Sequence, residues 1–172
     1  LRRDRAFRTF LYVQWLGGAV NMALPFYILQ VAPGGSVIAF AGILLGAQTA
    51  GGLVSNPLWG WWGDRRGKLS LLRLVSALNG LAPMAALVWI AGAGSQQLAV
   101  PWFAAVFFVL GAVGNGRTIA YLGYLMEISP DDRRPAYSGY FNALVAPAAL
   151  LPMAGAGLAA AFSFSAVFAA AL

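Results

Sequence analysis

The stretch GWWGDRRGKLSLLR, residues 60–73, places one acidic and four basic side chains in a short bend between two long apolar runs. Charge is rare elsewhere, because only 9% of the 172 residues are charged and 60% are hydrophobic. A soluble domain has about 25% charged residues. We therefore expect a membrane protein, in which a basic bend is typical of a loop between two membrane-spanning helices.

Apolar runs of about 20 residues, the length that crosses a bilayer as a helix, recur on both sides of this bend. We predict an all-α membrane protein with spans at residues 9–31, 36–62, 69–91, 98–126 and 136–161. A last run, residues 162–172, would reach roughly 17 Å, so the sixth span is expected to be incomplete. Because the first residue is not Met, we also expect the chain to be a piece of a longer protein.

Basic and uncharged connections alternate along these spans. Residues 1–8, the bend and residues 127–135 hold ten of the eleven basic residues, whereas residues 32–36 and 92–97 carry no charge. Basic loops remain on the cytoplasmic side of a membrane. We therefore predict a cytoplasmic N-terminus in a plasma or inner membrane, with each odd-numbered span running outward.

The composition also excludes several kinds of function. The chain contains no Cys and no His, which excludes disulfides, Cys/His metal sites and acid–base chemistry by histidine. No paired carboxylates lie deep within a predicted span, so we expect no enzyme and no bound cofactor or metal. The net charge of +6 gathers at span ends, where it would contact anionic lipid head groups and not nucleic acid.

Small residues and prolines recur inside the spans. Small residues let helix backbones approach closely within a membrane, and here they are Gly42 and Gly46 in a GxxxG pair, Gly111, Gly114, Gly155 and Gly157. Each proline removes a backbone hydrogen bond and can bend its helix, and the prolines are Pro25, Pro57, Pro83, Pro147 and Pro152. Two interpretations stay open: packing with fixed kinks, or bending points that gate a pathway.

The bend contains the pattern GxxxDRxGK at residues 60–68, which resembles the signature loop of the major facilitator superfamily. In that family the loop joins the second and third helices of each six-helix half, and here it joins the second and third predicted spans. EISPDDRR, residues 127–134, resembles the E-xx-P-xxx-R pattern that follows the fourth or tenth helix. The chain thus resembles the C-terminal half, helices 7–12 of a 12-helix fold with the last one truncated. It departs from the strongest motif at Leu69, where a second basic residue is common.

The resemblance implies two six-helix halves that tilt against each other around a central site. The bend would then act as a conformational latch, in which Asp64 holds a helix end of the missing N-terminal half, or Arg134, in one of two states. The implied latch residues are Gly60, Asp64, Arg65, Gly67, Lys68 and Arg134. On its residues alone, the bend is also explained as a generic basic loop on the cytoplasmic side.

Arg117 is the basic residue that lies away from the span ends. It precedes Glu127 by ten residues, roughly 15 Å along a helix, and a charge at that depth normally faces a cavity or a partner. Tyr121 and Tyr124 follow on the same helix face. An anionic substrate group, or an acidic residue of the missing half, would bind to this polar stripe. The alternative is a buried pair that only holds the bundle together.

Uncharged polar side chains within the spans are further candidates. In the resembled family the first, second, fourth and fifth helices of each half line the cavity. This favours Gln14, Asn21, Gln48 and Tyr140 as substrate-path residues, in addition to Arg117, Tyr121 and Tyr124. Asn79, in the third span, is expected to be structural. Single amides in a span are also explained as hydrogen bonds between helices, worth about 0.6 kcal/mol each.

Two functions remain open from the sequence. The resemblance favours a secondary active or facilitative transporter that moves a small molecule by alternating access. The alternative is a non-transporting membrane protein of the same fold, which would be a receptor, a sensor or an assembly partner. Because no span has an acidic residue near its centre, proton coupling would need a carboxylate from the missing half.

Overall fold

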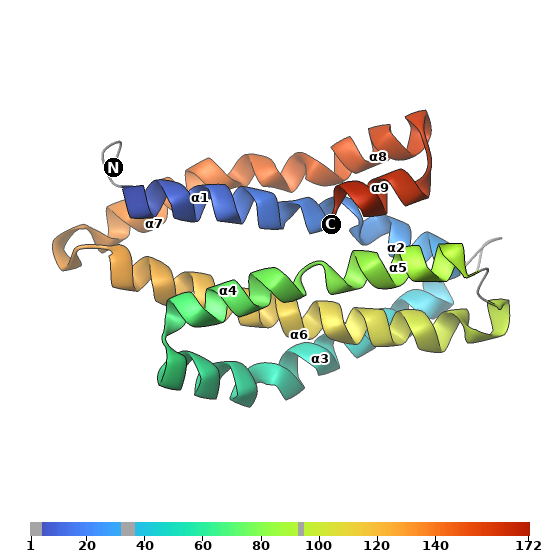
Figure 1. Ribbon diagram of the computed structural model, residues 1–172, viewed down its shortest axis with the longest axis horizontal. Coiled ribbons are helices and arrows are strands. Elements are labelled where there is room, and N and C mark those ends of the chain that lie inside the picture. The colour runs from blue at the N-terminus through green and yellow to red at the C-terminus, as the bar shows by residue number, and fades with distance from the viewer. Residues whose placement is uncertain (1–4, 32–36, 93–94) are drawn as a thin grey trace.

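The computed structural model describes residues 5–31, 37–92 and 95–172, which are helical and contain no strand (Figure 1). The helices are α1 (Arg5–Gly18), α2 (Leu24–Val31), α3 (Val37–Arg66), α4 (Lys68–Leu78), α5 (Leu81–Ala91), α6 (Gln96–Ile128), α7 (Arg134–Val145), α8 (Leu151–Ala161) and α9 (Phe164–Ala170). Three short 3₁₀ segments are η1 (Ala19–Met22), η2 (Asp131–Arg133) and η3 (Ala146–Leu150). The all-α class predicted from hydropathy is confirmed for these residues.

The helices form two groups that run along the long axis of the molecule (Figure 1). One group contains α1, α7 and α8, and the other contains α3, α4 and α6. At the end away from the N-terminus, α2 packs on α3 and α6, while α9 packs on α5 and α8. These contacts join the two groups.

The most extensive helix contact is between α3 and α6. A Cβ atom on Gly111 would overlap the backbone of Gln48, and one on Gly51 would overlap the backbone of Phe108. The two backbones touch because both glycines lack a side chain. The predicted GxxxG pair makes no such contact, since a Cβ on Gly42 or Gly46 would meet no described atom within 4 Å.

Three of the long helical segments are interrupted near their middle, and each interruption comes just before a proline. Proline has no N–H, so the carbonyl four residues before it loses its helical partner. Pro25 acts on η1, Pro83 on the turn at Asn79 and Gly80, and Pro152 on η3. The prolines therefore place three breaks within the bundle, where backbone carbonyls become available to side chains.

Two hydrophobic clusters hold the bundle together. Near the basic end they comprise Phe7, Phe10, Trp59, Leu71, Leu72, Val75, Val113, Ala120, Leu125, Tyr137 and Phe141. Toward the other end they comprise Met22, Ala23, Phe26, Tyr27, Leu44, Ala82, Ala86, Phe103, Val106, Phe107, Val167, Phe168 and Ala171. Two stretches of the chain, from α1 to α2 and from α4 to α5, run from the cluster near the basic end to the cluster toward the other end. Each contains a polar residue at its break, Asn21 and Asn79.

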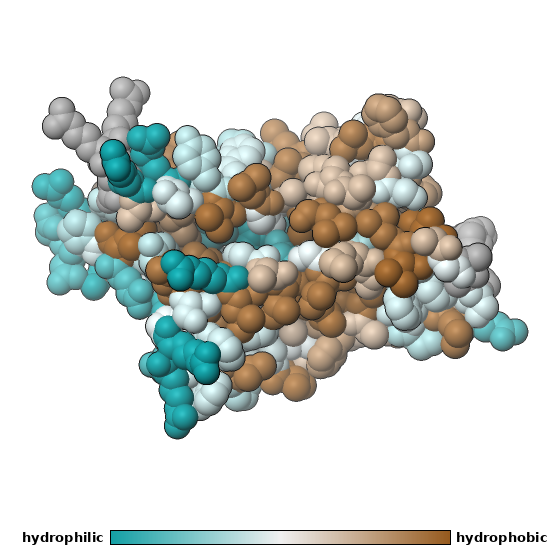
Figure 2. Space-filling view, in the orientation of Figure 1, coloured by the Kyte–Doolittle hydropathy of each residue, from teal (hydrophilic) through white to brown (hydrophobic). Residues whose placement is uncertain are grey.

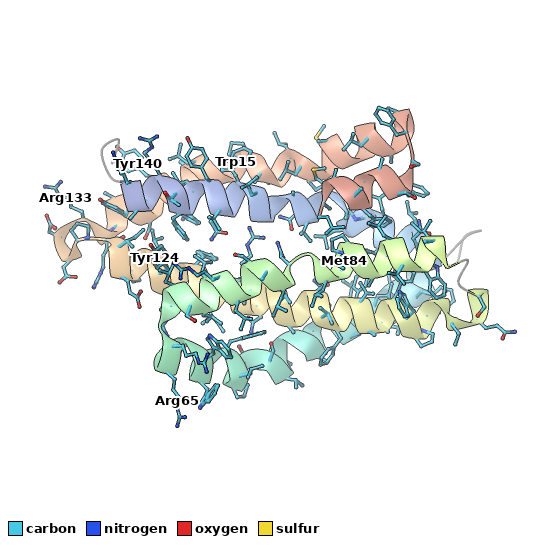
Figure 3. The ribbon with its side chains drawn as sticks, in the orientation of Figure 1. Trp15, Arg65, Met84, Tyr124, Arg133 and Tyr140 are labelled. Carbon is cyan, nitrogen blue, oxygen red and sulfur yellow. The ribbon has the colours of Figure 1, made fainter. Side chains whose placement is uncertain are left out.

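The basic connections lie together at one end of the molecule. The start of α1, the turn between α3 and α4 and the connection from α6 to α7 are at this end, where Arg65 and Arg133 lie (Figures 1 and 3). In the space-filling view hydrophilic residues gather at the same end, and the middle is mainly apolar (Figure 2). This separation is typical of a helical bundle that sits in a bilayer.

The helical segments begin and end within four residues of the predicted spans. By length and composition alone, three continuous stretches in the described part are long and apolar enough to cross a membrane: Lys68–Ala91, Gln97–Ile128 and Asp131–Ala161. The number of crossings, six with the last one incomplete, stays a prediction. The connection at residues 32–36 and part of that at 92–97 lie outside the described residues.

Candidate functional site

Arg117 extends from α6 to the last turn of α1. Its Nε donates to Oε1 of Gln14 at 3.2 Å, its Nη1 to the carbonyl oxygen of Gly17 at 2.8 Å, and its Nη2 to the carbonyl oxygen of Gln14 at 3.1 Å. A Cβ on Gly17 would lie 3.4 Å from the guanidinium carbon, in ordinary van der Waals contact, so the arginine packs directly against this residue. The arginine is thus held in place by one side chain and two backbone carbonyls.

The break after α1 explains why the carbonyl of Gly17 is available. The last carbonyls of an α-helix have no partner within the helix, and α1 ends at Gly18, where the 3₁₀ segment η1 begins. The amide of Asn79, at the break between α4 and α5, also donates to the carbonyl oxygen of Gly17, at 2.9 Å. Three separate segments therefore meet at one backbone oxygen.

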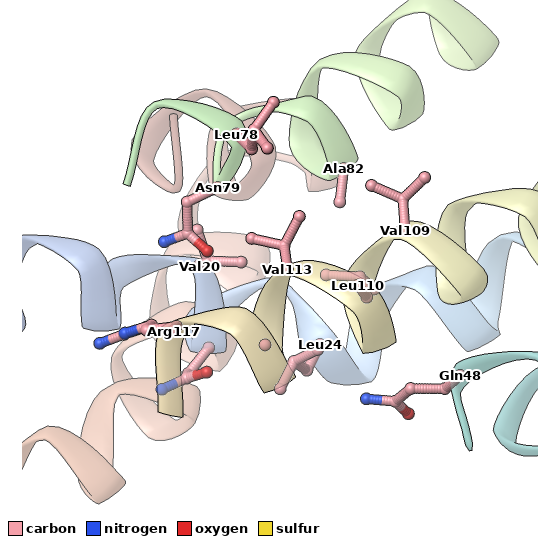
Figure 4. Close-up of a pocket in the computed structure, with 12 residues that line it drawn as sticks. Val20, Leu24, Gln48, Leu78, Asn79, Ala82, Val109, Leu110, Val113 and Arg117 are labelled. Carbon is pink, nitrogen blue, oxygen red and sulfur yellow. The ribbon is translucent and has the colours of Figure 1, made fainter. Parts of the chain in front are cut away.

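Two cavities adjoin this junction. The larger is an open cleft of about 510 Å³ between α1, α6 and α7, and the smaller encloses about 120 Å³ toward α2, α3 and α5. Arg117, Asn21 and Gly114 border both of them. In the smaller one, Gln48 lies on the opposite side from Arg117 and Asn79 (Figure 4). The guanidinium therefore stands between two spaces and not within solid packing.

The larger cleft is lined by both polar and apolar groups. Gln14, Asn21, Arg117, Thr118 and Asn142 contribute polar groups to its lining. Tyr121 and Phe141 contribute aromatic rings to the lining. The two rings stack with centroids 5.3 Å apart at an angle of 19°. Val145, Ala146, Ala148 and Ala149 complete the lining. Such a mixture of apolar walls and few polar groups is usual in small-molecule sites.

Arg117 has no acidic partner among the described residues. The described ion pairs are Asp64 with Lys68, Asp131 with Arg134 and Asp132 with Arg133, all at the basic end. Within the same part of the chain, no three His, Cys, Asp or Glu side chains come together as a metal site would require. The positive charge of Arg117 is therefore balanced by dipoles alone in the described residues.

The structure brings together most of the predicted substrate-path residues and leaves out two. Arg117, Tyr121, Gln14 and Asn21 line the larger cleft, and Gln48 lines the smaller cavity. Tyr124 instead packs its ring edge against Phe10, with centroids 5.4 Å apart, and Tyr140 is 54% exposed away from both cavities.

Sequence reasoning missed two contributors to the junction. The carbonyl oxygen of Gly17 has no side-chain signal, and Asn79 was assigned a structural role in another span. The proline four residues after Asn79 was the available signal, because it marks a helix break at that residue. Asn79 does have a structural role here, but it also borders the smaller cavity.

Five of the six latch candidates lie in and near the turn between α3 and α4, and Arg134 lies at the start of α7. Gly67 has a φ of +82°, which a residue with a side chain rarely adopts. Lys68 pairs with Asp64 at 2.8 Å, and its aliphatic stem would meet a Cβ on Gly123 at 2.9 Å, so that glycine makes space for it. Arg65 lies over the ring of Trp61 at 5.2 Å.

Among the described residues, Arg134 forms no ion pair with Asp64 in this structure. Arg134 pairs with Asp131 at 2.7 Å, within its own connection. A Cβ on Gly60 would meet no described atom within 4 Å. The side chain of Asp64 is 78% exposed, so its carboxylate remains accessible to a further partner.

Comparison with known proteins gives one match. A family model described as Major Facilitator Superfamily matches residues 1–172. No match was found among curated proteins or among solved structures. The family match covers the basic bend, the junction at Arg117 and both cavities.

Proposed function

Because the chain belongs to the major facilitator superfamily, we propose that it moves a small molecule across a membrane by alternating access. Proteins of this family are transporters embedded in a membrane, and the long apolar helices agree with that environment. The proposal is more specific than the family, since it assigns a mechanism and a pathway to this chain.

The observation that carries the proposal is the position of Arg117. A charged side chain deep in a membrane span is costly unless it faces a cavity or a partner, and here it borders an open cleft of about 510 Å³. A pathway for a small polar molecule gives this residue a role that packing alone does not. An anionic group is the substrate feature that an arginine would hold.

We assign the movement to a tilt of this helical bundle against a second six-helix half. The basic end lies on the cytoplasmic side of a plasma or inner membrane in this proposal. In this arrangement the bend is a latch. Its exposed carboxylate, Asp64, would accept hydrogen bonds from a helix N-terminus of the other half in one state and release it in the other.

Flux through proteoliposomes tests both parts of the proposal. Asp64→Asn keeps the shape of the side chain and removes its charge, so we expect slower transport with unchanged insertion, measured as uptake or efflux against protein recovered in the membrane. Gly139→Ala is a matched control, since a Cβ there would meet no described atom within 4 Å. Unchanged flux in Asp64→Asn would refute the latch. No flux of any compound by the wild-type protein would favour a receptor or sensor instead.

A further inference from the structure

The guanidinium group of Arg117 uses only part of its hydrogen-bonding capacity. A guanidinium has five N–H groups, and three of them donate to Gln14 Oε1, Gln14 O and Gly17 O. One N–H on each Nη atom has no partner among the described residues. All three acceptors are neutral, so the charge at this point of the span has no counter-ion.

Gln14 shows the same deficit in a buried position. Its side chain is 3% exposed and borders the larger cleft. Its Oε1 accepts from Arg117, whereas its Nε2 is buried and has no hydrogen-bond partner among the described residues. An unpaired buried donor is unfavourable. Nε2 of Gln14 is enclosed by the protein, so the N–H donors that remain for a ligand at this point of the cleft are those of Arg117.

We propose that this cleft binds a small organic monoanion through a carboxylate group, whose oxygens accept hydrogen bonds from the two N–H groups of Arg117 that have no partner among the described residues. The inference rests on the proposed transport function and specifies its substrate class. A carboxylate supplies both the counter-ion and the acceptors that the site lacks. Arg117 is the one cationic side chain in the described lining, so a single carboxylate balances the charge that this bundle contributes to the site.

The remaining lining of the cleft indicates what the uncharged part of the ligand would be. The ring of Tyr121 lines the cleft and is backed by the buried ring of Phe141, and a flat apolar group packs well against such an aromatic surface. A volume of about 510 Å³ lies within the roughly 300–1,000 Å³ that is usual for small-molecule sites. An aromatic or similarly flat monocarboxylate therefore fits the walls, the charge and the size together.

Binding to the intact transporter in lipid nanodiscs tests this assignment directly. The probes are benzoate, its uncharged analogue benzamide, and acetate, which has the charge without the ring. We expect benzoate to bind most tightly, measured by isothermal titration calorimetry and by the shift in melting temperature. Equal binding of benzoate and benzamide, or no binding of benzoate at millimolar concentration, would overturn the proposal.

The decisive variant is Gln14→Glu, which places a carboxylate beside Arg117 within the protein itself. The internal ion pair would compete with the ligand, so benzoate affinity should fall at least about tenfold while the protein stays as stable as the wild type or becomes more stable. Arg117→Gln should lose benzoate binding by a similar factor, and Arg117→Lys should retain part of it because the charge remains.

Arg133→Gln is the matched control, since it removes a positive charge from an exposed connection outside the cleft. Benzoate affinity should not change in this variant. Unreduced benzoate binding in both Gln14→Glu and Arg117→Gln would contradict the assignment. Flux assays separate the two proposals: bound benzoate that is not moved contradicts transport, whereas flux of neutral compounds without benzoate binding contradicts the ligand class only.

Discussion

At the scale of single residues, glycines decide where large side chains fit in this bundle. Trp59 is buried between α3 and α6, and its indole N–H donates to the carbonyl oxygen of Ala112 at 2.7 Å. The space for the ring exists because Gly116, one turn further along α6, has no side chain. A Cβ there would lie 2.8 Å from Cε2 of Trp59 and 2.9 Å from Cγ1 of Val75.

Gly116→Ala should therefore destabilise the protein by about 1–3 kcal/mol, since the buried ring and Val75 cannot both move away without strain. The melting temperature of the purified protein measures this effect. Gly114→Ala on the same helix is the comparison, because a Cβ at that position meets no described atom within 4 Å and alanine favours the helix more than glycine does. Equal melting temperatures for the two variants would show that Trp59 does not depend on Gly116 for its position.

At the scale of elements, the crossing of α3 and α6 is the contact on which the rest of the bundle is built. The backbones meet at Gly51 and Gly111, with no side chain between them. Around this crossing, Asn115 on α6 donates to the carbonyl oxygen of Gly52 on α3 at 3.0 Å. Close backbone packing with added polar contacts is the usual way in which helices associate within a membrane.

Gly111→Ala should separate these two helices, because the added methyl group overlaps backbone atoms that no rotamer change can move. We expect a large loss of protein that remains monodisperse after extraction in mild detergent, measured by size-exclusion chromatography. Gly42→Ala and Gly46→Ala on α3 serve as controls and should leave the yield unchanged, since both positions are open in the described structure. A yield for Gly111→Ala equal to that of the controls would contradict the close crossing.

The same helices illustrate what the sequence could and could not predict. The pattern of hydropathy and charge predicted helical segments close to their observed bounds, because those features are local. Of the glycines named from the sequence, Gly111 makes the close contact and the GxxxG pair Gly42 and Gly46 does not, while Gly51, on the facing helix, was not singled out. Many helix faces carry small residues, and only the partner helix determines which of them is used.

At the scale of the whole molecule, the candidate site depends on contacts between distant parts of the chain. The depth of Arg117 was evident from its distance to the next charged residue. Its partners were not, because Gln14 and Gly17 are about 100 residues away and two of the three acceptors are backbone oxygens. A helix break that frees carbonyls has only an indirect signature, a proline that follows the break in the sequence.

The gathering of basic connections at one end leads to the last prediction, the orientation of the chain in its membrane. Because the chain has no Cys, single cysteines can be placed without background. Arg133→Cys lies at the basic end, and Ser95→Cys and Ser163→Cys lie at connections of the opposite end (Figure 1). All three positions are exposed.

A membrane-impermeant maleimide applied to intact cells should label Ser95→Cys and Ser163→Cys, and it should label Arg133→Cys only after the membrane is opened. The physical reason is that basic connections are retained on the cytoplasmic side. Labelling of Arg133→Cys in intact cells would place the bend outside and remove the cytoplasmic latch. Labelling of only one of the two serine variants would instead mean an odd number of crossings between α5 and α9, and the bundle would then not lie in the bilayer as one parallel set of spans.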